Sequence, residues 1–232
     1  MKTIGMIGGM SWESSVEYYR LINRAVRARL GGLHSAQSLM YSVDFAEIEA
    51  LQRSGEWASA ADRIIDAARR LQAGGADFLV ICTNTMHKLA DPVEAAVSIP
   101  LLHIADATGA RVRDAGLTRV GLLATRFTME ETFYSGRLRD RFGLEVLVPD
   151  AAGRALVHDV IYSELCAGIV NDRSRTRYCE IGRILIEQGA QGLILGCTEI
   201  GLLIHQTHFA GRVFDTTRIP AAAAVEAALT TG

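Results

Sequence analysis

The sequence predicts an α/β fold built as two halves, each a mainly parallel sheet flanked by helices. Three observations support this. Short apolar runs typical of buried strands alternate with longer helical patterns along all 232 residues. Two segments of the first half recur in the second half at nearly constant spacing. Hydrophobic residues make up 49% of the chain, which is enough to build a core in each half.

The first half is expected to contain four strands and their connecting helices. A strand at 3–7 ends in Gly8-Gly9, and the capping-box pattern Ser14-Ser15-Val16-Glu17 predicts a helix from there to Leu30. The other elements expected in this half are strands at 39–43, 78–82 and 101–104, and helical segments at 47–52 and 58–73.

The second half shows the same alternation of strand and helix. The strands expected here are 120–124, 144–148, 193–196 and 213–214. The helices expected are 105–115, 129–141, 154–167, 173–188 and 220–229. In such a sheet, binding loops lie at the carboxyl ends of the strands.

The two halves resemble each other in sequence. Gly5 precedes Gly121 by 116 residues (121 − 5 = 116), and each glycine opens a strand. Residues 71–81 align without gaps on residues 185–195 at an offset of 114 (189 − 75 = 114). Any two strand–helix units share such features, but the similar loops that follow both strands favour a repeat. We predict domains at 1–104 and 105–217, with 218–232 packing back onto the first.

Composition excludes several classes of function. The net charge is −2 with no basic cluster, so no nucleic-acid partner is expected. No apolar run approaches the roughly 18 residues that span a bilayer, and the amino-terminal apolar stretch is too short for a signal peptide. We therefore expect no membrane partner and a cytoplasmic location. The only lysines are Lys2 and Lys88, and neither has a phosphate cradle nearby, which argues against pyridoxal phosphate.

Small polar residues gather after the strand of each repeat. The first loop reads Cys82-Thr83-Asn84-Thr85-Met86-His87, and the second reads Gly196-Cys197-Thr198-Glu199. The ungapped register sets Thr83 opposite Cys197 and Cys82 opposite Gly196. Because side chains alternate along a strand, Cys82 is expected to point away from whatever Cys197 faces.

Two other motifs are weak. His205 and His208 could hold a metal, but no third ligand stands near them in sequence, so we expect a surface loop and no metal. The glycines after the first strand do not form a G-x-G-x-x-G dinucleotide fingerprint.

The segments Gly8-Gly9-Met10-Ser11, Asn84-Thr85-x-His87 and Gly196-Cys197-Thr198-Glu199 together resemble the aspartate/glutamate racemase family, in its aspartate/glutamate or broad-specificity branch. The resemblance implies two pseudosymmetric domains with the active site in the cleft between them. It also implies an amino-acid substrate, no cofactor and a homodimer. Members of the family use two cysteines on opposite faces of the substrate Cα, one removing the α-proton and the other supplying a proton.

This sequence departs from the family at one catalytic position. The family's first loop reads Cys-Asn-Thr, whereas here Thr83 precedes Asn84. Both the family pattern and the internal repeat favour Thr83 over Cys82 as the residue that faces the substrate, and the alternative stays open. We expect Cys197 to be a thiolate near neutrality, since a thiol has a pKa of about 8.5 that neighbours can lower. A hydroxyl needs an adjacent base, so one direction of proton transfer should be slow.

The resemblance also implies which residues bind the substrate. Its carboxylate would accept hydrogen bonds from three side chains, those of Asn84, Thr85 and Thr198. Backbone amides or hydroxyls of Met10, Ser11 and Thr125 are further candidates.

Two residues have open roles. Glu199 could take the substrate ammonium or orient Cys197, or it could simply be a charge at a helix amino terminus. His87 could orient Thr83 or raise its acidity, or it could be a structural histidine.

Gln52 bears on specificity. In aspartate-specific relatives an Arg near this position binds the side-chain carboxylate, and Gln52 supplies no charge. Neutral substrates such as homoserine or methionine therefore remain open. Two other functions also remain: a one-cysteine decarboxylase or cis–trans isomerase of the same superfamily, and a protein that binds an amino acid without catalysis.

Overall fold

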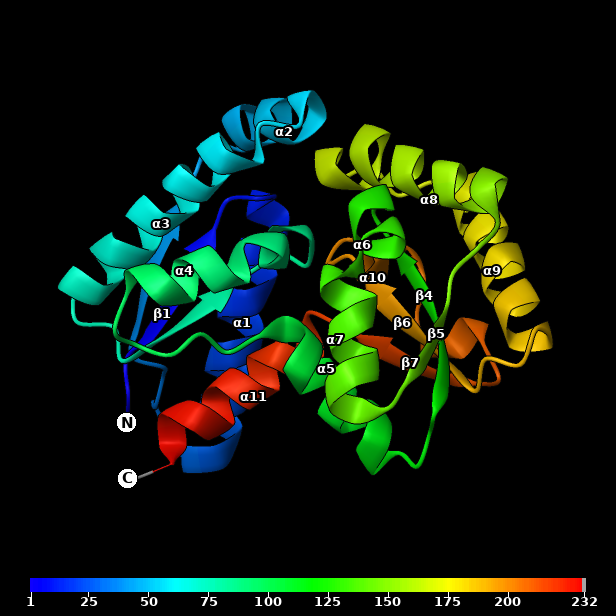
Figure 1. Ribbon diagram of the computed structural model, residues 1–232. Helices are drawn as coiled ribbons and strands as arrows, with labels where there is room; N and C mark the ends of the chain where they lie inside the picture. The colour runs from blue at the N-terminus through cyan, green and yellow to red at the C-terminus, as the bar shows by residue number, and fades with distance from the viewer. Residues whose placement is uncertain (231–232) are drawn as a thin grey trace. The chain divides into compact units, whose positions relative to one another are not determined.

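The computed structural model describes residues 1–230, which divide into two compact units (Figure 1). Unit 1 comprises Met1–Ile104 and the segment from Pro220 onward, and unit 2 comprises Ala105–Ile219. The domains expected from sequence are 1–104 and 105–217, with 218–232 joined to the first.

Unit 1 is built on a three-stranded parallel sheet in the order β2-β1-β3. Its strands are β1 (Ile4–Gly8), β2 (Ser38–Ser42) and β3 (Phe78–Ile81). Its helices are α1 (Trp12–Leu30), α2 (Phe45–Ser54), α3 (Trp57–Ala73), the 3-10 turn η1 (Thr85–Leu89), α4 (Ala90–Ala96) and α11 (Arg218–Leu229).

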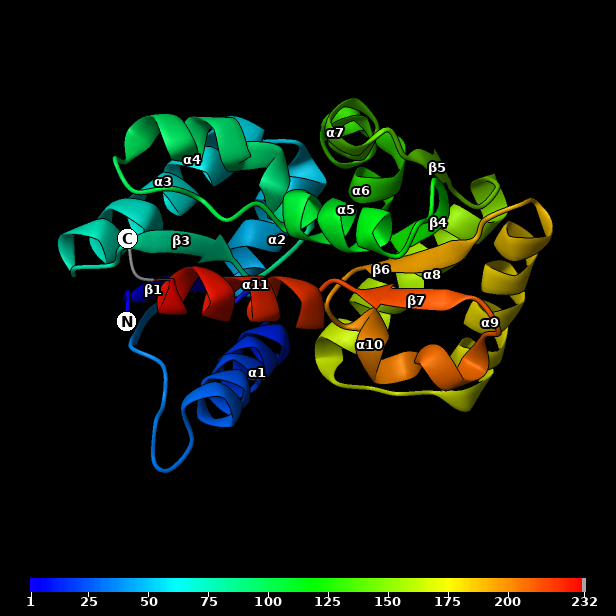
Figure 2. The ribbon, with the colours of Figure 1, turned by 90° about the horizontal axis from the view of Figure 1, so that it is seen from below.

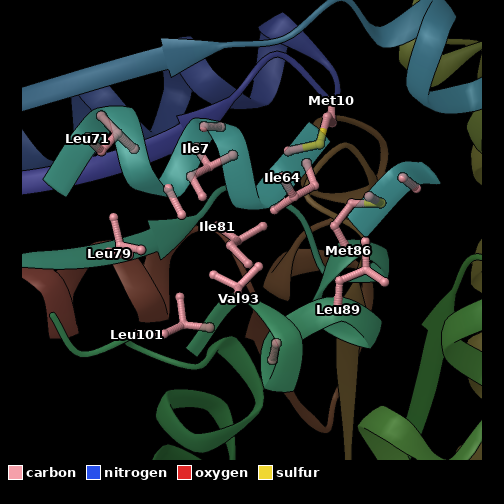
Figure 3. Packing of buried hydrophobic residues seen from close by; sticks show 14 of the residues in the cluster. Ile7, Met10, Ile64, Leu71, Leu79, Ile81, Met86, Leu89, Val93 and Leu101 are labelled. Carbon is pink, nitrogen blue, oxygen red and sulfur yellow. The ribbon is translucent and has the colours of Figure 1, made fainter. Parts of the chain in front are cut away.

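Alternate strand residues fill two cores in unit 1. Ile7, Leu79 and Ile81 lie in the cluster that contains the buried sides of α3 and α4 (Figure 3). Met6 and Val80 lie in a second cluster, with the buried sides of α1 and α11. Figure 2 shows α1 and α11 on the same side of this sheet. Parallel strands with both faces covered are apolar at every position, as β1 and β3 are.

Unit 2 is built on a four-stranded parallel sheet in the order β5-β4-β6-β7. Its strands are β4 (Arg119–Ala124), β5 (Glu145–Leu147), β6 (Gly192–Gly196) and β7 (Arg212–Asp215). Its helical elements are α5 (Ile104–Asp114), α6 (Arg126–Glu130), α7 (Thr132–Phe142), α8 (Ala151–Ser163), η2 (Leu165–Ala167), α9 (Asp172–Glu187), α10 (Ile200–Leu203) and η3 (Gln206–His208).

The helix–turn–strand that repeats in sequence also repeats in structure. Gly75 and Gly189 both have positive φ, 93° and 101°. In each turn the following alanine donates a backbone hydrogen bond of 3.0 Å to the carbonyl five residues earlier. The strands β3 and β6 therefore leave their turns in the same register, and Thr83 and Cys197 occupy equivalent positions of the two units.

The start of α1 differs from the prediction. The helix begins at Trp12 with Ser11 as its N-cap residue, so Ser14 and Ser15 lie inside the first turn. The Ser15 hydroxyl accepts a hydrogen bond from the Gly9 amide (2.8 Å) and donates one to the Ser11 carbonyl (3.0 Å). The N-cap therefore lies three residues before the expected Ser14, and the neighbouring Ser15 fastens the loop after β1.

Three other predicted elements are also corrected. The strand at 101–104 is only a single bridge between Leu101 and Leu79, and α5 already begins at Ile104. The helix at 129–141 is divided between α6 and α7 by the extended backbone of Glu131. The helix at 154–167 begins earlier, because the Asp150 side chain caps it, and ends at Ser163 before the turn η2.

Gly9 is required by both its backbone angle and its surroundings. Its φ is +93°, and a Cβ placed there would lie 2.2 Å from the Val43 carbonyl oxygen. Gly75 has the same φ but nothing within 4 Å of such a Cβ. We predict that Gly75→Ala lowers the free energy of unfolding by about 1–2 kcal/mol through backbone strain. Gly9→Ala should cost about 2 kcal/mol more, because the loop after β2 must also move.

Urea denaturation of the two variants measures this difference directly. Equal losses would mean that the packing of the β1 loop against Val43 contributes nothing to stability.

Candidate active site

Each unit has a cluster of buried polar residues at the carboxyl ends of its central strands. In unit 1 most of these residues follow β1 and β3, and Gln52 lies on α2, which follows β2. In unit 2 they follow β4 and β6. We call them half-site 1 and half-site 2. The buried polar side chains of half-site 1 are Ser11, Gln52, Asn84, Thr85 and His87, and those of half-site 2 are Thr125, Thr198 and Glu199. Parallel α/β sheets hold their ligands at this end.

The loop after β1 is held by its own hydrogen bonds. The Gly8 carbonyl accepts from the Val43 amide at 3.0 Å, and Ser15 secures both Gly9 and Ser11. The Met10 side chain is buried in the cluster that also contains Met86 (Figure 3). Met10 can therefore offer a ligand its backbone groups, whereas its side chain is committed to the core.

Cys82 and Thr83 have different surroundings. Cys82 is 2% exposed and lies in the apolar cluster between the sheet and helices α1 and α11. Burial raises the pKa of its thiol to about 12, so this cysteine stays protonated and is surrounded by hydrocarbon. Thr83 is half-buried and belongs to neither apolar cluster.

His87 bridges two backbone segments with its two ring nitrogens. The Ile104 amide donates to Nε2 at 3.1 Å, so the ring proton is on Nδ1, which donates to the Thr83 carbonyl at 2.8 Å. The His103 ring lies 4.6 Å from that of His87 between centroids. Of the two roles expected for His87, the geometry fits a structural histidine that fixes the Thr83 backbone.

Asn84, Thr85 and Gln52 are almost fully buried, with exposed fractions of 1%, 4% and 4%. Asn84 and Thr85 open the 3-10 turn that follows β3. The Gln52 amide nitrogen lies 3.0 Å from the Met86 sulfur and donates to it. Gln52 therefore packs directly against the loop that carries Asn84 and Thr85.

The centre of half-site 2 is one carboxylate oxygen with two donors. Glu199 Oε2 accepts a hydrogen bond from the Cys197 thiol at 2.9 Å and from the Thr198 hydroxyl at 2.8 Å. Glu199 is 3% exposed and Cys197 is 8% exposed. Of the three roles expected for Glu199, the geometry fits the one that orients Cys197. The Thr198 hydroxyl, expected to bind a substrate carboxylate, is directed to Glu199 instead.

The surroundings of Cys197 do not favour the expected thiolate. Burial raises the pKa of the Cys197 thiol well above its ordinary value, and the negative charge of Glu199 raises it further. No cation offsets these effects in the described surroundings of the thiol. Cys197 is therefore a thiol that donates its proton to a ready acceptor.

Residues that sequence reasoning missed support half-site 2. After β7, the Thr216 hydroxyl donates to the Leu195 carbonyl at 2.6 Å, and the Thr217 hydroxyl donates to the Thr198 carbonyl at 3.3 Å. These bonds fix the chain on either side of Cys197. Consecutive threonines after a predicted strand were the only signal in the sequence. The predicted residue Thr125 serves as the N-cap of α6, where its hydroxyl oxygen accepts from the Thr128 amide at 3.4 Å.

Cys166 is a further acidic group near Cys197. It is half-buried in η2, and its charge, if ionised, would raise the pKa of Cys197. The Tyr178 hydroxyl is buried in the same neighbourhood and donates to the Val157 carbonyl at 2.7 Å. Burial and the acidic groups Glu199 and Cys166 therefore all raise the pKa of Cys197.

Two kinds of feature are absent from residues 1–230. Within that range no group of three or more His, Cys, Asp or Glu side chains could hold a metal ion. The His208 ring nitrogen Nδ1 accepts a hydrogen bond from the His205 backbone amide at 3.0 Å. Over the same residues, no helix has the length and apolar character needed to cross a bilayer.

Comparison with known proteins identifies the family. The model of the family described as Asp/Glu/hydantoin racemase matches residues 7–224. The chain belongs to this family. The predictions of a racemase-family isomerase and of an α/β fold with two parallel sheets are thereby confirmed.

Individual proteins similar to this chain are described as racemases or as racemase homologues. A Yersinia pestis protein assigned as an Asp/Glu racemase is 53% identical over 99% of this chain and 100% of its own, with a TM-score of 0.92. An aspartate racemase homologue from Pyrococcus horikoshii is 31% identical over 99% and 100%, with a TM-score of 0.85. A broad-specificity amino-acid racemase of Bacillus subtilis is 27% identical over 144 residues, which cover 61% of this chain and 60% of that protein.

The protonation of Cys197 can be tested by removing the charge of Glu199. We predict that Glu199→Gln lowers the pKa of Cys197, because the glutamine oxygen still accepts from the thiol but carries no negative charge. The pH profile of iodoacetamide modification, followed by mass spectrometry of the Cys197 peptide, should move to lower pH. The exposed Glu187→Gln on α9 is the matched control and should leave the profile unchanged. A profile that stays in place or moves to higher pH in Glu199→Gln would contradict this assignment.

Proposed function

We propose that the chain is a cofactor-independent amino-acid racemase in which Cys197 and Thr83 act on opposite faces of one substrate Cα. The observation that carries the proposal is the pair formed by the Cys197 thiol and the Glu199 carboxylate. A thiol with a built-in proton acceptor can serve as either base or acid. The equivalent position of the other unit carries Thr83, because β3 and β6 leave their turns in the same register.

Proton removal at Cys197 proceeds through Glu199. The thiol proton passes to Glu199 Oε2, and the resulting thiolate takes the α-proton of the substrate and becomes a thiol again. The substrate is left as a planar carbanion, which a proton from the opposite face converts into the other enantiomer. In the reverse direction the Cys197 thiol supplies its proton to the carbanion, and the thiolate left behind regains a proton from solvent by way of Glu199.

Thr83 supplies or removes the proton on the other face. An alkyl hydroxyl is a far weaker acid than a thiol and needs a partner for the proton. His87 is not that partner, since its two ring nitrogens are bonded to the Thr83 carbonyl and the Ile104 amide. A water molecule must therefore relay the proton, and we expect this step to be slower than the step at Cys197.

Substrate recognition would use the buried donors of both half-sites. Asn84 and Thr85, with the backbone of the Met10–Ser11 loop, are the donors proposed for the substrate carboxylate. Thr198 could join them only by turning its hydroxyl away from Glu199. Gln52 is the residue proposed to meet the substrate side chain, and as a neutral amide it would accept acidic and neutral amino acids alike.

One observation favours a second candidate. The catalytic chemistry would rest on Cys197 as the single cysteine of the two half-sites, since Cys82 is buried among apolar side chains and remains protonated. A one-cysteine decarboxylase or isomerase needs only such a residue. A silent amino-acid-binding protein needs neither Cys197 nor Thr83 for its function.

The asymmetry between the two faces is measured by hydrogen exchange. Enantiomers have equal free energies, so kcat/KM must be the same in both directions, and the asymmetry appears as exchange without inversion. In D2O we predict that one enantiomer gains deuterium at Cα faster than it inverts, because Cys197 can remove and return a proton before Thr83 acts. The other enantiomer should exchange no faster than it inverts. Proton NMR of Cα and optical rotation follow the two rates.

Variants assign the two steps. Cys197→Ala should lower exchange and inversion by about 10²–10⁴-fold, the usual contribution of a general base. Thr83→Ala should slow inversion and spare the exchange at the Cys197 face, whereas Thr83→Cys should speed inversion. Cys82→Ala is the matched control and should change neither rate. Exchange without any inversion would favour one-base chemistry, and no exchange with any amino acid would reject the racemase.

A further inference from the structure

Helices α6 and α8 of unit 2 are joined at two places, and each place includes an arginine (Figure 1). Arg154 on α8 forms an ion pair with Glu130 at the end of α6, at 2.8 Å. At the start of α6, the Arg126 amide donates to Nδ1 of His158 on α8 at 3.3 Å. The Arg126 side chain is exposed and forms no ion pair within the described residues 1–230. Its charge is therefore available to a bound anion.

Arg126 lies at the carboxyl-terminal end of the unit 2 sheet, next to the loop that carries Cys197. Strands β4 and β6 are paired with Ala124 opposite Gly196. The chain continues to Thr125 and Arg126 after β4, and to Cys197 after β6. Neighbouring strands lie about 4.8 Å apart, so Thr125 and Cys197 leave the sheet side by side. Arg126 therefore stands at the edge of half-site 2, one residue beyond Thr125.

This position suits the far end of a substrate better than its Cα. The causes that raise the pKa of Cys197 are burial, Glu199 and Cys166, and the charge of Arg126 is not among the effects on this thiol. The guanidinium therefore does not act on the thiol. In the proposed racemase the thiol meets the substrate Cα, and an acidic substrate carries a second carboxylate beyond its Cβ. A cation at the edge of the half-site can meet that carboxylate.

His158 adds a hydrogen-bond donor beside the guanidinium. Because Nδ1 accepts from the Arg126 amide, the proton of the neutral ring is on Nε2. Burial lowers the pKa of His158 and the charge of Arg126 lowers it further, against smaller opposite effects of Asp159 and Glu130. The ring is therefore neutral at neutral pH. No acceptor among residues 1–230 bonds to Nε2, so its N–H is open to a ligand.

Two aromatic rings flank the imidazole. Phe127 meets the His158 ring edge-on, with 6.0 Å between centroids, and Tyr162, four residues further along α8, lies 4.8 Å away. The guanidinium carbon of Arg126 lies 5.7 Å from the centre of the Phe127 ring. Rings beside a charge displace water and lower the local dielectric constant. An ion pair formed here with a carboxylate is therefore stronger than one in open solvent.

We propose that Arg126 and His158 form the subsite for the side-chain carboxylate of the substrate. The guanidinium supplies the charge and the paired N–H donors that fit a carboxylate, and the imidazole supplies a further donor. This inference rests on the racemase proposed above, and it adds the discrimination that the neutral Gln52 does not provide. Aspartate and glutamate would be favoured over asparagine and glutamine, which have nearly the same shape but no negative charge.

The subsite is tested by comparing glutamate with glutamine in two assays of the full chain. One assay measures kcat/KM for exchange of the Cα proton in D2O, and the other measures Kd by calorimetry. Arg126→Gln should weaken both parameters for glutamate by about 10–100-fold, the range expected for a lost charged hydrogen bond. Glutamine should change by less than about twofold, because it has no charge for Arg126 to bind. The matched control is Arg212→Gln, which removes an exposed cation at the amino-terminal end of β7 and should change neither substrate.

The role of His158 is tested by two amide substitutions. His158→Gln can place its amide N–H near the position of Nε2, whereas His158→Asn places its amide near Nδ1 and retains only the contact with the Arg126 amide. We expect the first variant to keep most of the preference for glutamate and the second to lose about tenfold of it. Circular dichroism and thermal melting show whether each variant is folded.

Four results would overturn the proposal. They are no binding of glutamate to the unmodified chain, equal binding of glutamate and glutamine, a preference that survives in Arg126→Gln, and an equal loss for both ligands in that variant. The last result would place the guanidinium at the α-carboxylate. Failure of the racemase itself gives a different pattern: Cα exchange would be absent, while calorimetry would still show the preference for glutamate and its loss in Arg126→Gln.

Discussion

One buried carboxylate oxygen organises the chemistry of this racemase-family chain. Glu199 Oε2 accepts from the Cys197 thiol and from the Thr198 hydroxyl, and the three residues are consecutive in the loop after β6. The arrangement keeps the thiol protonated by burial and by charge, and supplies the acceptor that would let it ionise. Thr216 and Thr217 hold the carbonyls on either side of this loop, so the geometry depends on β7 as well as on β6.

The loop after β3 in unit 1 is arranged differently from the loop after β6, although both strands follow their turns in the same register. Thr83 follows β3 where Cys197 follows β6, and the residue that secures its loop is His87, which bonds to backbone. Half-site 1 thus offers a hydroxyl on a fixed backbone, and half-site 2 offers a thiol with a proton acceptor. The proposed racemase is asymmetric for this reason: a duplicated fold carries unequal acids at equivalent positions.

The two-unit α/β fold and the equivalence of Thr83 and Cys197 could be predicted from the sequence. The internal repeat aligns the two loops without any knowledge of contacts. The Gly-Ala turns at 75–76 and 189–190 were enough to align Thr83 with Cys197 and to separate Cys82 from both. What the sequence could not give depends on where side chains point in three dimensions. The pKa of Cys197 was expected to fall, and it rises, because the thiol is buried and its hydrogen-bond partner is an anion. The start of α1 was missed because its N-cap is Ser11, three residues before the Ser14 of the capping-box pattern.

The most direct measurement is the infrared S–H stretch of Cys197 in the ligand-free protein, assigned by its loss in Cys197→Ser. The account predicts that the band is present from neutral to mildly alkaline pH, lies at the low frequency of a thiol bonded to a carboxylate, and shifts upward in Glu199→Gln. Absence of the band at neutral pH would mean that Cys197 rests as a thiolate. That result would contradict the role assigned to Glu199.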